Sequence, residues 1–161
     1  MAVPGESTGF LGFLLAAMRG ARRFCNSVRM ALGVLIVDDN RLFLEAARAL
    51  LEREGLRVVG VAATSAEALQ RAEELRPQVI LVDIMLGGES GFDLARRLAR
   101  QSPGGGPTVI LISTHAGADF ADLIAQSPAA GFVPKPELSA EAIRRIVDGR
   151  ASGGPCGTPA R

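Results

Sequence analysis

The sequence is poor in residues that form disulfides or bind zinc. Among 161 residues there are two cysteines, Cys25 and Cys156, which lie far apart, and one histidine, His115. The cysteines form no CxxC pair, so neither a disulfide framework nor a zinc site is expected. We therefore expect two reduced thiols in a cytoplasmic protein.

An excess of charge and a long apolar run are also missing. The 18 basic and 17 acidic residues give a formal charge of +1, so nothing global attracts the chain to nucleic acid or to an anionic membrane. The apolar run from Phe10 to Met18 is too short to cross a bilayer. Its arginines follow it, whereas a secretory signal carries its positive charges first. We expect no direct binding to nucleic acid and no membrane role.

Lysine occurs once, at Lys135, and every other basic residue is an arginine. An ammonium is a compact point charge, whereas a guanidinium is a planar fork, so the two are not interchangeable at a tight site. A lone lysine in an arginine-rich chain indicates a position where arginine does not serve.

The central part of the chain alternates short apolar runs with amphipathic stretches. Strands are predicted at 34–37, 57–61, 79–82, 109–112 and 132–133, and helices at 41–54, between Thr64 and Pro77, at 91–100, at 119–126 and after Ser139. Phe43, Ala47, Leu50 and Leu51 are predicted to form the buried stripe of the first helix. Such alternation implies right-handed crossovers and a parallel sheet covered on both faces.

The flanks of this region are predicted to lie outside the domain. Residues 1–32 are interpreted as a flexible extension or a start assigned too early, with Met30 as an alternative start. Residues 149–161, rich in glycine and proline, are interpreted as a disordered tail. The predicted domain is 33–148.

Polar residues follow four of the predicted strands: Asp38 with Asp39, then Asp83, then Ser113, and finally Lys135. In parallel sheets ligands bind at the carboxyl ends of the strands. Three carboxylates gathered there repel one another unless a cation keeps them ionised, and Mg²⁺ suits such oxygen ligands. The hydroxyl and the ammonium suit phosphoryl oxygens. Taken singly, each residue is equally well a cap, a loop hydroxyl or a solvated charge, but the set indicates phosphoryl chemistry.

Residues 33–148 resemble the receiver domain of two-component response regulators, of the kind found in chemotaxis regulators. The resemblance lies in VLIVDD at Val34–Asp39 with Asn40, VILVDI at Val79–Ile84 with Gly91, ILIST at Ile110–Thr114, and Lys135 with Pro136. It implies an α/β fold, namely a flavodoxin-like (βα)5 three-layer sandwich with a parallel five-stranded sheet of order 2-1-3-4-5.

The resemblance also implies roles for the residues at the strand ends. Asp83 would be the phosphoacceptor, and Ser113 and Lys135 would contact the phosphoryl group. The ligands of Mg²⁺ would be Asp38, Asp39, Asp83 and the main-chain carbonyl of Met85. Ser113 and Phe132 would form the switch, in which Phe132 lacks the hydroxyl of the more usual tyrosine.

Three further positions depart from the common pattern or invite another role. Many members have a proline at position 87, where this chain has Gly87 followed by Gly88, and the two glycines predict a more flexible loop. Thr114 is bulkier than the usual alanine. His115 is considered as a phosphohistidine, but its place in a loop after a strand favours a role in controlling the access of water to the site.

The resulting hypothesis is a stand-alone receiver protein in a two-component phosphorelay. A histidine kinase or phosphotransfer protein would supply the phosphoryl group, and an unknown protein target would respond. The chain would not be an enzyme, although it assists its own phosphorylation and dephosphorylation, and it would be a monomer or a phosphorylation-dependent dimer.

Three alternatives are weighed. A receiver that has lost its DNA-binding output domain is the main one, but residues 151–161 are too few for a recognition helix. A phosphatase of the haloacid dehalogenase type wants an acid two residues after the nucleophile, where Met85 stands. A degenerate receiver used as a scaffold would not need the complete set of acids, hydroxyl and lysine.

Overall fold

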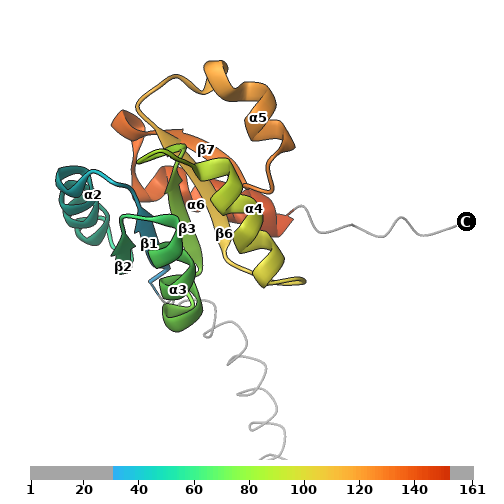
Figure 1. Ribbon diagram of the computed structural model, residues 1–161. Helices are drawn as coiled ribbons and strands as arrows, with labels where there is room; N and C mark the ends of the chain where they lie inside the picture. The colour runs from blue at the N-terminus through green and yellow to red at the C-terminus, as the bar shows by residue number, and fades with distance from the viewer. Residues whose placement is uncertain (1–30, 153–161) are drawn as a thin grey trace, which may run out of the picture. The chain divides into compact units, whose positions relative to one another are not determined.

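A parallel sheet of five strands forms the centre of the computed structural model, which describes residues 31–152 (Figure 1). The strands are β1 (Gly33–Val37), β2 (Arg57–Ala62), β3 (Val79–Asp83), β6 (Thr108–Ser113) and β7 (Gly131–Pro134). They are ordered β2-β1-β3-β6-β7. This confirms the predicted order 2-1-3-4-5 of a flavodoxin-like sheet. The predictions for residues 1–30 and 153–161 lie outside the described residues.

Helices cover both faces of the sheet, as predicted for a three-layer sandwich. They are α2 (Arg41–Arg53), α3 (Ser65–Leu75), α4 (Gly91–Gln101), α5 (Ala121–Gln126) and α6 (Ala140–Ser152), with 3-10 turns η1 (Gly117–Phe120) and η2 (Lys135–Glu137). Among the described residues, none of the helices has the length and apolar character that crossing a bilayer requires.

Two apolar clusters hold the layers together. One joins alternate residues of β1, Val34 and Ile36, to α2 and α6. The other joins the intervening residues, Leu35 and Val37, to α3 and α4, which lie in front of the sheet in Figure 1. Because successive side chains of a strand point to opposite faces, a continuous apolar run such as β1 is stable only between two layers of helix.

Side-chain caps mark where α2, α3 and α6 begin. Asn40 Oδ1 accepts hydrogen bonds from the amides of Leu42 and Phe43 at the start of α2. The predicted caps at Thr64 and Ser139 are confirmed, since their hydroxyl oxygens accept from the amides of Glu67 and Ala142, respectively. These caps satisfy amides that have no partner within a helix.

The buried stripe of α2 differs from the predicted one. Leu44, Ala47 and Leu51 are buried, whereas Phe43 and Leu50 are only partly buried. The missed residue, Leu44, lies on the same face of the helix as Ala47 and Leu51, which is the face that meets the sheet. Helix α2 is therefore rotated about its own axis relative to the prediction. This rotation leaves Phe43 facing the carboxyl edge of the sheet, near Lys135.

A short hairpin between β3 and α4 was not predicted. It pairs β4 (Met85–Leu86) with β5 (Glu89–Ser90) in antiparallel register. Gly87 and Gly88 form its turn, with φ angles of 53° and 95°. Positive φ at both central residues is what a tight two-residue hairpin turn requires, and glycine adopts it without steric cost. The two glycines thus form a defined turn, where the sequence predicted only a more flexible loop.

Candidate functional site

The predicted polar residues lie at the carboxyl edge of the sheet. Asp38 and Asp39 follow β1, Asp83 ends β3, Ser113 ends β6 and Lys135 follows β7. Carboxylate oxygens of the three aspartates lie within 4.8 Å of one another. Three acids at that separation form a strongly negative pocket that suits a hard divalent cation.

Lys135 joins two of these acids. Its Nζ lies 2.6 Å from Asp38 Oδ2 and 3.0 Å from Asp83 Oδ2, and its side chain is 11% exposed. Burial by itself lowers the pKa of Lys135, but its contacts with the two carboxylates outweigh burial, so the pKa is raised overall. The ammonium therefore stays charged and offsets part of the negative charge in the pocket.

Asp38 is fully buried, and its two oxygens differ in their surroundings. Oδ1 accepts a hydrogen bond from the amide of Asn40 at 2.8 Å. Oδ2 has no hydrogen-bond partner among the described residues. Its short contact with Lys135 is an ion pair whose geometry falls short of a hydrogen bond. Burial is the main cause of the raised pKa of Asp38, against smaller lowering effects of Lys135 and Asn40. A buried carboxylate oxygen with spare capacity fits a metal ligand.

Asp83 makes close contacts with the residues that follow it in the chain. Its Oδ1 accepts from the amide of Met85 at 3.2 Å. At Gly91, the first residue of α4, an added Cβ would lie only 2.1 Å from the main-chain oxygen of Asp83. The amide of Gly91 also donates to the carbonyl of Ile84 at 2.9 Å. Helix α4 can approach the phosphoacceptor candidate this closely only because residue 91 has no side chain.

Two exposed apolar side chains lie at the rim of the site. Leu42 is 78% and Met85 62% exposed, on α2 and on the hairpin respectively.

The expected switch residues lie beside the site. Ser113 is buried, and its hydroxyl oxygen accepts from the amide of His115 at 3.1 Å. The Phe132 ring packs so closely on η1 that a Cβ at Gly117 would lie 2.9 Å from it. His115 is exposed and meets Phe120 edge to face at 6.3 Å.

Two residues near the site were missed as functional candidates. Phe43 was assigned to the core, but its ring centroid lies 4.5 Å from Lys135 Nζ. Glu89 was not singled out, but its Oε2 accepts from the amide of Ser65 at 3.0 Å, so it links the hairpin to α3. The apolar character of Phe43 matched the helical stripe, and an acid beside a helix start reads as an ordinary cap. The sequence therefore carried no signal for either contact.

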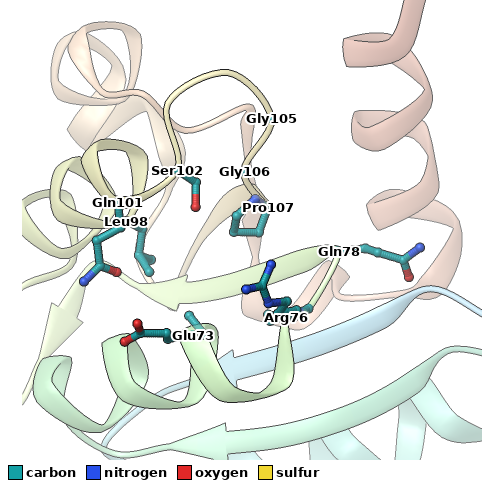
Figure 2. A pocket seen from close by; sticks show the side chains of 11 residues that line it. Glu73, Arg76, Gln78, Leu98, Gln101, Ser102, Gly105, Gly106 and Pro107 are labelled. Carbon is teal, nitrogen blue, oxygen red and sulfur yellow. The ribbon is translucent and has the colours of Figure 1, made fainter.

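A cavity in the described part of the chain lies away from these residues. Figure 2 shows it between the ends of α3 and α4, with Arg76, Gln78 and Pro107 around it. Its volume is about 550 Å³. Gln78 directly precedes β3, so this cavity lies at the amino edge of the sheet, opposite Asp83. It is not the site of the acidic cluster.

Comparison with known proteins identifies the family of this site. The family model described as response regulator receiver domain matches residues 34–148. The response regulator GacA of Pseudomonas viridiflava is 34% identical over 114 residues, which are 70% of this chain and 52% of that protein. A protein-glutamate methylesterase/protein-glutamine glutaminase of Alkalilimnicola ehrlichii is 33% identical over 139 residues, 81% of this chain and 35% of that protein. This chain thus spans about half the length, or less, of these curated relatives.

Solved structures agree with this match. A CheY-like response regulator receiver domain protein from Methanospirillum hungatei JF-1 has a TM-score of 0.64 and 26% identity, over 77% of this chain and 99% of that one. A LuxR-family two-component response regulator from Aurantimonas sp. SI85-9A1 has a TM-score of 0.66 and 28% identity, over 76% and 86%. The likeness thus covers about three quarters of this chain.

Proposed function

Because this chain belongs to the response regulator receiver domain family of two-component signalling, we propose that Asp83 accepts a phosphoryl group and that the resulting change alters the binding of a protein target. The donor is a histidine kinase or a phosphotransfer protein. The observation that carries the proposal is the placement of one ammonium, Lys135, between two acids, Asp38 and Asp83, with a third acid, Asp39, beside them.

The acids fit a magnesium ion. Asp38, Asp39, Asp83 and the main-chain carbonyl of Met85 would hold it. The donor set is supported by the buried Asp38 Oδ2, which pairs with Lys135 but has no hydrogen-bond partner among the described residues. When bound, Mg²⁺ supplies positive charge that offsets the negative charge of the acids and of the incoming phosphoryl group.

The proposed transfer is a displacement at phosphorus. A carboxylate oxygen of Asp83 attacks the phosphorus of the donor's phosphohistidine, so that an O–P bond forms as the N–P bond breaks. The departing imidazole keeps the electron pair of that bond and takes up a proton. Lys135 and, once it has turned toward the site, the hydroxyl of Ser113 donate to the phosphoryl oxygens and so stabilise their negative charge. The chain is a phosphoacceptor that assists its own modification, and it has no substrate to turn over.

The surroundings of Asp83 suit a docking donor. Asp83 is 5% exposed, so only a small part of its side chain is accessible to a donor. The exposed side chains of Leu42 and Met85 lie on the two segments that follow Asp39 and Asp83 in the chain. Apolar side chains left in water at the entrance of a charged pocket are typical of a surface that a partner covers.

The proposed response moves Ser113 and Phe132. A phosphoryl group adds a charge of about −1.5 to −2 and three acceptor oxygens at Asp83. Ser113 turning toward it leaves space into which the Phe132 ring can rotate, away from Gly117. That motion would change the face formed by α5, β7 and α6. We further propose a cytoplasmic protein, monomeric or dimerising on phosphorylation, whose target is a protein and not nucleic acid.

The test is phosphorylation by acetyl phosphate, followed by intact-mass measurement. We expect one phosphoryl group on the parent protein, which requires Mg²⁺ and is absent from Asp83→Asn. The matched control is Asp93→Asn, since Asp93 is an exposed acid on α4 that pairs with Arg96. Labelling that persists undiminished in Asp83→Asn, or with all divalent metal chelated, would contradict the assignment.

A further inference from the structure

The hairpin β4–β5 is too small to be stable by itself. Each strand has two residues, and the connecting turn is two glycines. Isolated two-stranded hairpins are marginal in water even when they are longer, and glycine increases the conformational entropy of the unpaired state. Contacts outside the hairpin must therefore hold it, and it carries the Met85 carbonyl expected at the metal.

The first strand of the hairpin, β4, is held by burial and by hydrogen bonds next to β3. Leu86 is 1% exposed and belongs to the apolar cluster of α3 and α4. The amide of Met85 donates to Asp83 Oδ1, and Gly91 closes the base through the carbonyl of Ile84. At the turn, a Cβ added at Gly88 would meet nothing within 4 Å, whereas one added at Gly87 would lie 3.4 Å from Asp39 Oδ2.

A side-chain hydrogen bond links the returning strand to α3. Glu89 reaches from β5 to α3, where its Oε2 accepts from the amide of Ser65 at 3.0 Å. Ser65 is the first residue of α3 and is 4% exposed. Hydrogen bonds to the Ser65 hydroxyl and amide lower the pKa of Glu89, so the carboxylate is ionised at neutral pH. A carboxylate at a helix N-terminus meets unpaired amides and the positive end of the helix dipole.

The amide of Ser65, which donates to Glu89, belongs to a helix that packs on the sheet. Ala68 and Leu69 of α3 are buried against the sheet. The N-cap Thr64 accepts from the amide of Glu67, which leaves the Ser65 amide to Glu89. Leu86 pairs with Glu89 and Met85 pairs with Ser90 in the hairpin ladder. A displacement of Glu89 is therefore passed directly to the strand that carries Met85.

We propose that Glu89 is a positioning residue: its bond to the first turn of α3 fixes hairpin β4–β5, and with it the Met85 carbonyl, in the place where that carbonyl completes the magnesium site. The proposal rests on the proposed function, because it takes the acidic cluster to be that site. It assigns Glu89 no direct contact with the metal.

Two conservative variants separate this role from a simple effect of charge. Glu89→Asp keeps the charge but is one methylene shorter, so it cannot keep the bond to Ser65 with the hairpin in place. Glu89→Gln keeps the length and an acceptor oxygen but removes the charge. The control for general loss of an exposed carboxylate is Glu45→Gln on α2. Mg²⁺ affinity is measured on the unphosphorylated protein by titration of amide chemical shifts, and the melting temperature is measured without metal.

A positioning role predicts that Glu89→Asp weakens Mg²⁺ binding about fivefold or more, the effect expected of one lost charge-assisted hydrogen bond. Glu89→Gln should stay within about twofold of the parent because an acceptor remains. Amide exchange at Leu86 should be faster in Glu89→Asp than in the parent. Glu45→Gln should leave both readouts unchanged.

Other outcomes overturn the proposal. If Glu89→Gln weakens binding and Glu89→Asp does not, the carboxylate acts through space by its charge. If Glu89→Asp lowers only the melting temperature, Glu89 is a helix cap and nothing more. A parent protein that binds no Mg²⁺ refutes the proposed site itself, whereas a change confined to the variants concerns Glu89 alone.

Discussion

The contact between Phe43 and Lys135 leads to a prediction that can be worked through in energy. The ring centroid lies 4.5 Å from Nζ, within the range of a cation–π interaction. Such contacts are worth about 0.5–1 kcal/mol when exposed and about 2 kcal/mol when desolvated. The Lys135 side chain is 11% exposed, which favours the upper part of this range. The two acids also hold the ammonium, however, so we expect a coupling of about 1 kcal/mol.

A double-mutant cycle isolates this coupling. Phe43→Leu removes the aromatic face and keeps an apolar side chain on α2. Lys135→Met removes the ammonium and leaves Asp38 buried without its partner, which by itself costs about 3–5 kcal/mol. That cost is present with either residue at position 43, so it cancels in the cycle. Phe43→Tyr keeps the ring and should retain the coupling.

The assay is urea denaturation of the parent, the two single variants and the double variant. A second readout uses the single lysine of the chain, whose side-chain methylene protons give one set of NMR signals. In the parent the ring current should move these signals upfield, and in Phe43→Leu the displacement should vanish. A coupling below about 0.5 kcal/mol, the usual error of additivity, together with an unmoved lysine signal, would refute the reasoning.

Two further expectations concern stability. In Gly91→Ala the new Cβ, 2.1 Å from the main-chain oxygen of Asp83, forces α4 and β3 apart. We expect a loss of about 1–3 kcal/mol in the free energy of unfolding and slower phosphorylation, whereas Gly149→Ala, in open space on α6, should not destabilise. The Ala63 amide, and secondarily Arg71, lower the pKa of Glu67 from its ordinary value of 4.5. Because the pKa is lower in the folded state, the ionised Glu67 stabilises the protein fully above its ordinary pKa. This stabilisation is lost as the pH falls through the pKa of the folded state. Glu67→Gln should therefore lose stability less steeply than the parent when acid unfolding is followed below pH 4.5.

The sheet and the positions of the site residues could be predicted because both follow from chain order. Apolar runs such as Val34–Val37 and Val79–Val82 are strands only if both faces are covered, and alternation with helices makes the sheet parallel. The residue after each strand must then lie at one edge. This reasoning brought Asp38, Asp83 and Lys135 together without reference to any distance.

The hairpin and its link to α3 could not be predicted in this way. Two-residue strands are too short to show a period of two, and a pair of glycines is compatible with a tight turn as well as with a mobile loop. The bond from Glu89 to Ser65 joins segments whose separation depends on packing. The rotation of α2 was missed for a similar reason, because Phe43 and Leu44 both fit an apolar stripe and only contact with the sheet selects Leu44.

The assembly of the site from several strand ends also has a consequence for folding. Asp38 follows β1, Asp83 ends β3 and Lys135 follows β7, and β6 lies between the last two of these strands. Parallel neighbours are joined by crossovers, so these pairings are non-local and form slowly compared with helices. A nascent or partly folded chain has its acids before it has the ammonium that holds them together. On the proposed function, competence to take up a phosphoryl group is therefore expected only once β1, β3 and β7 are all in place, and the rate at which refolding chains gain it should report the assembly of these strands.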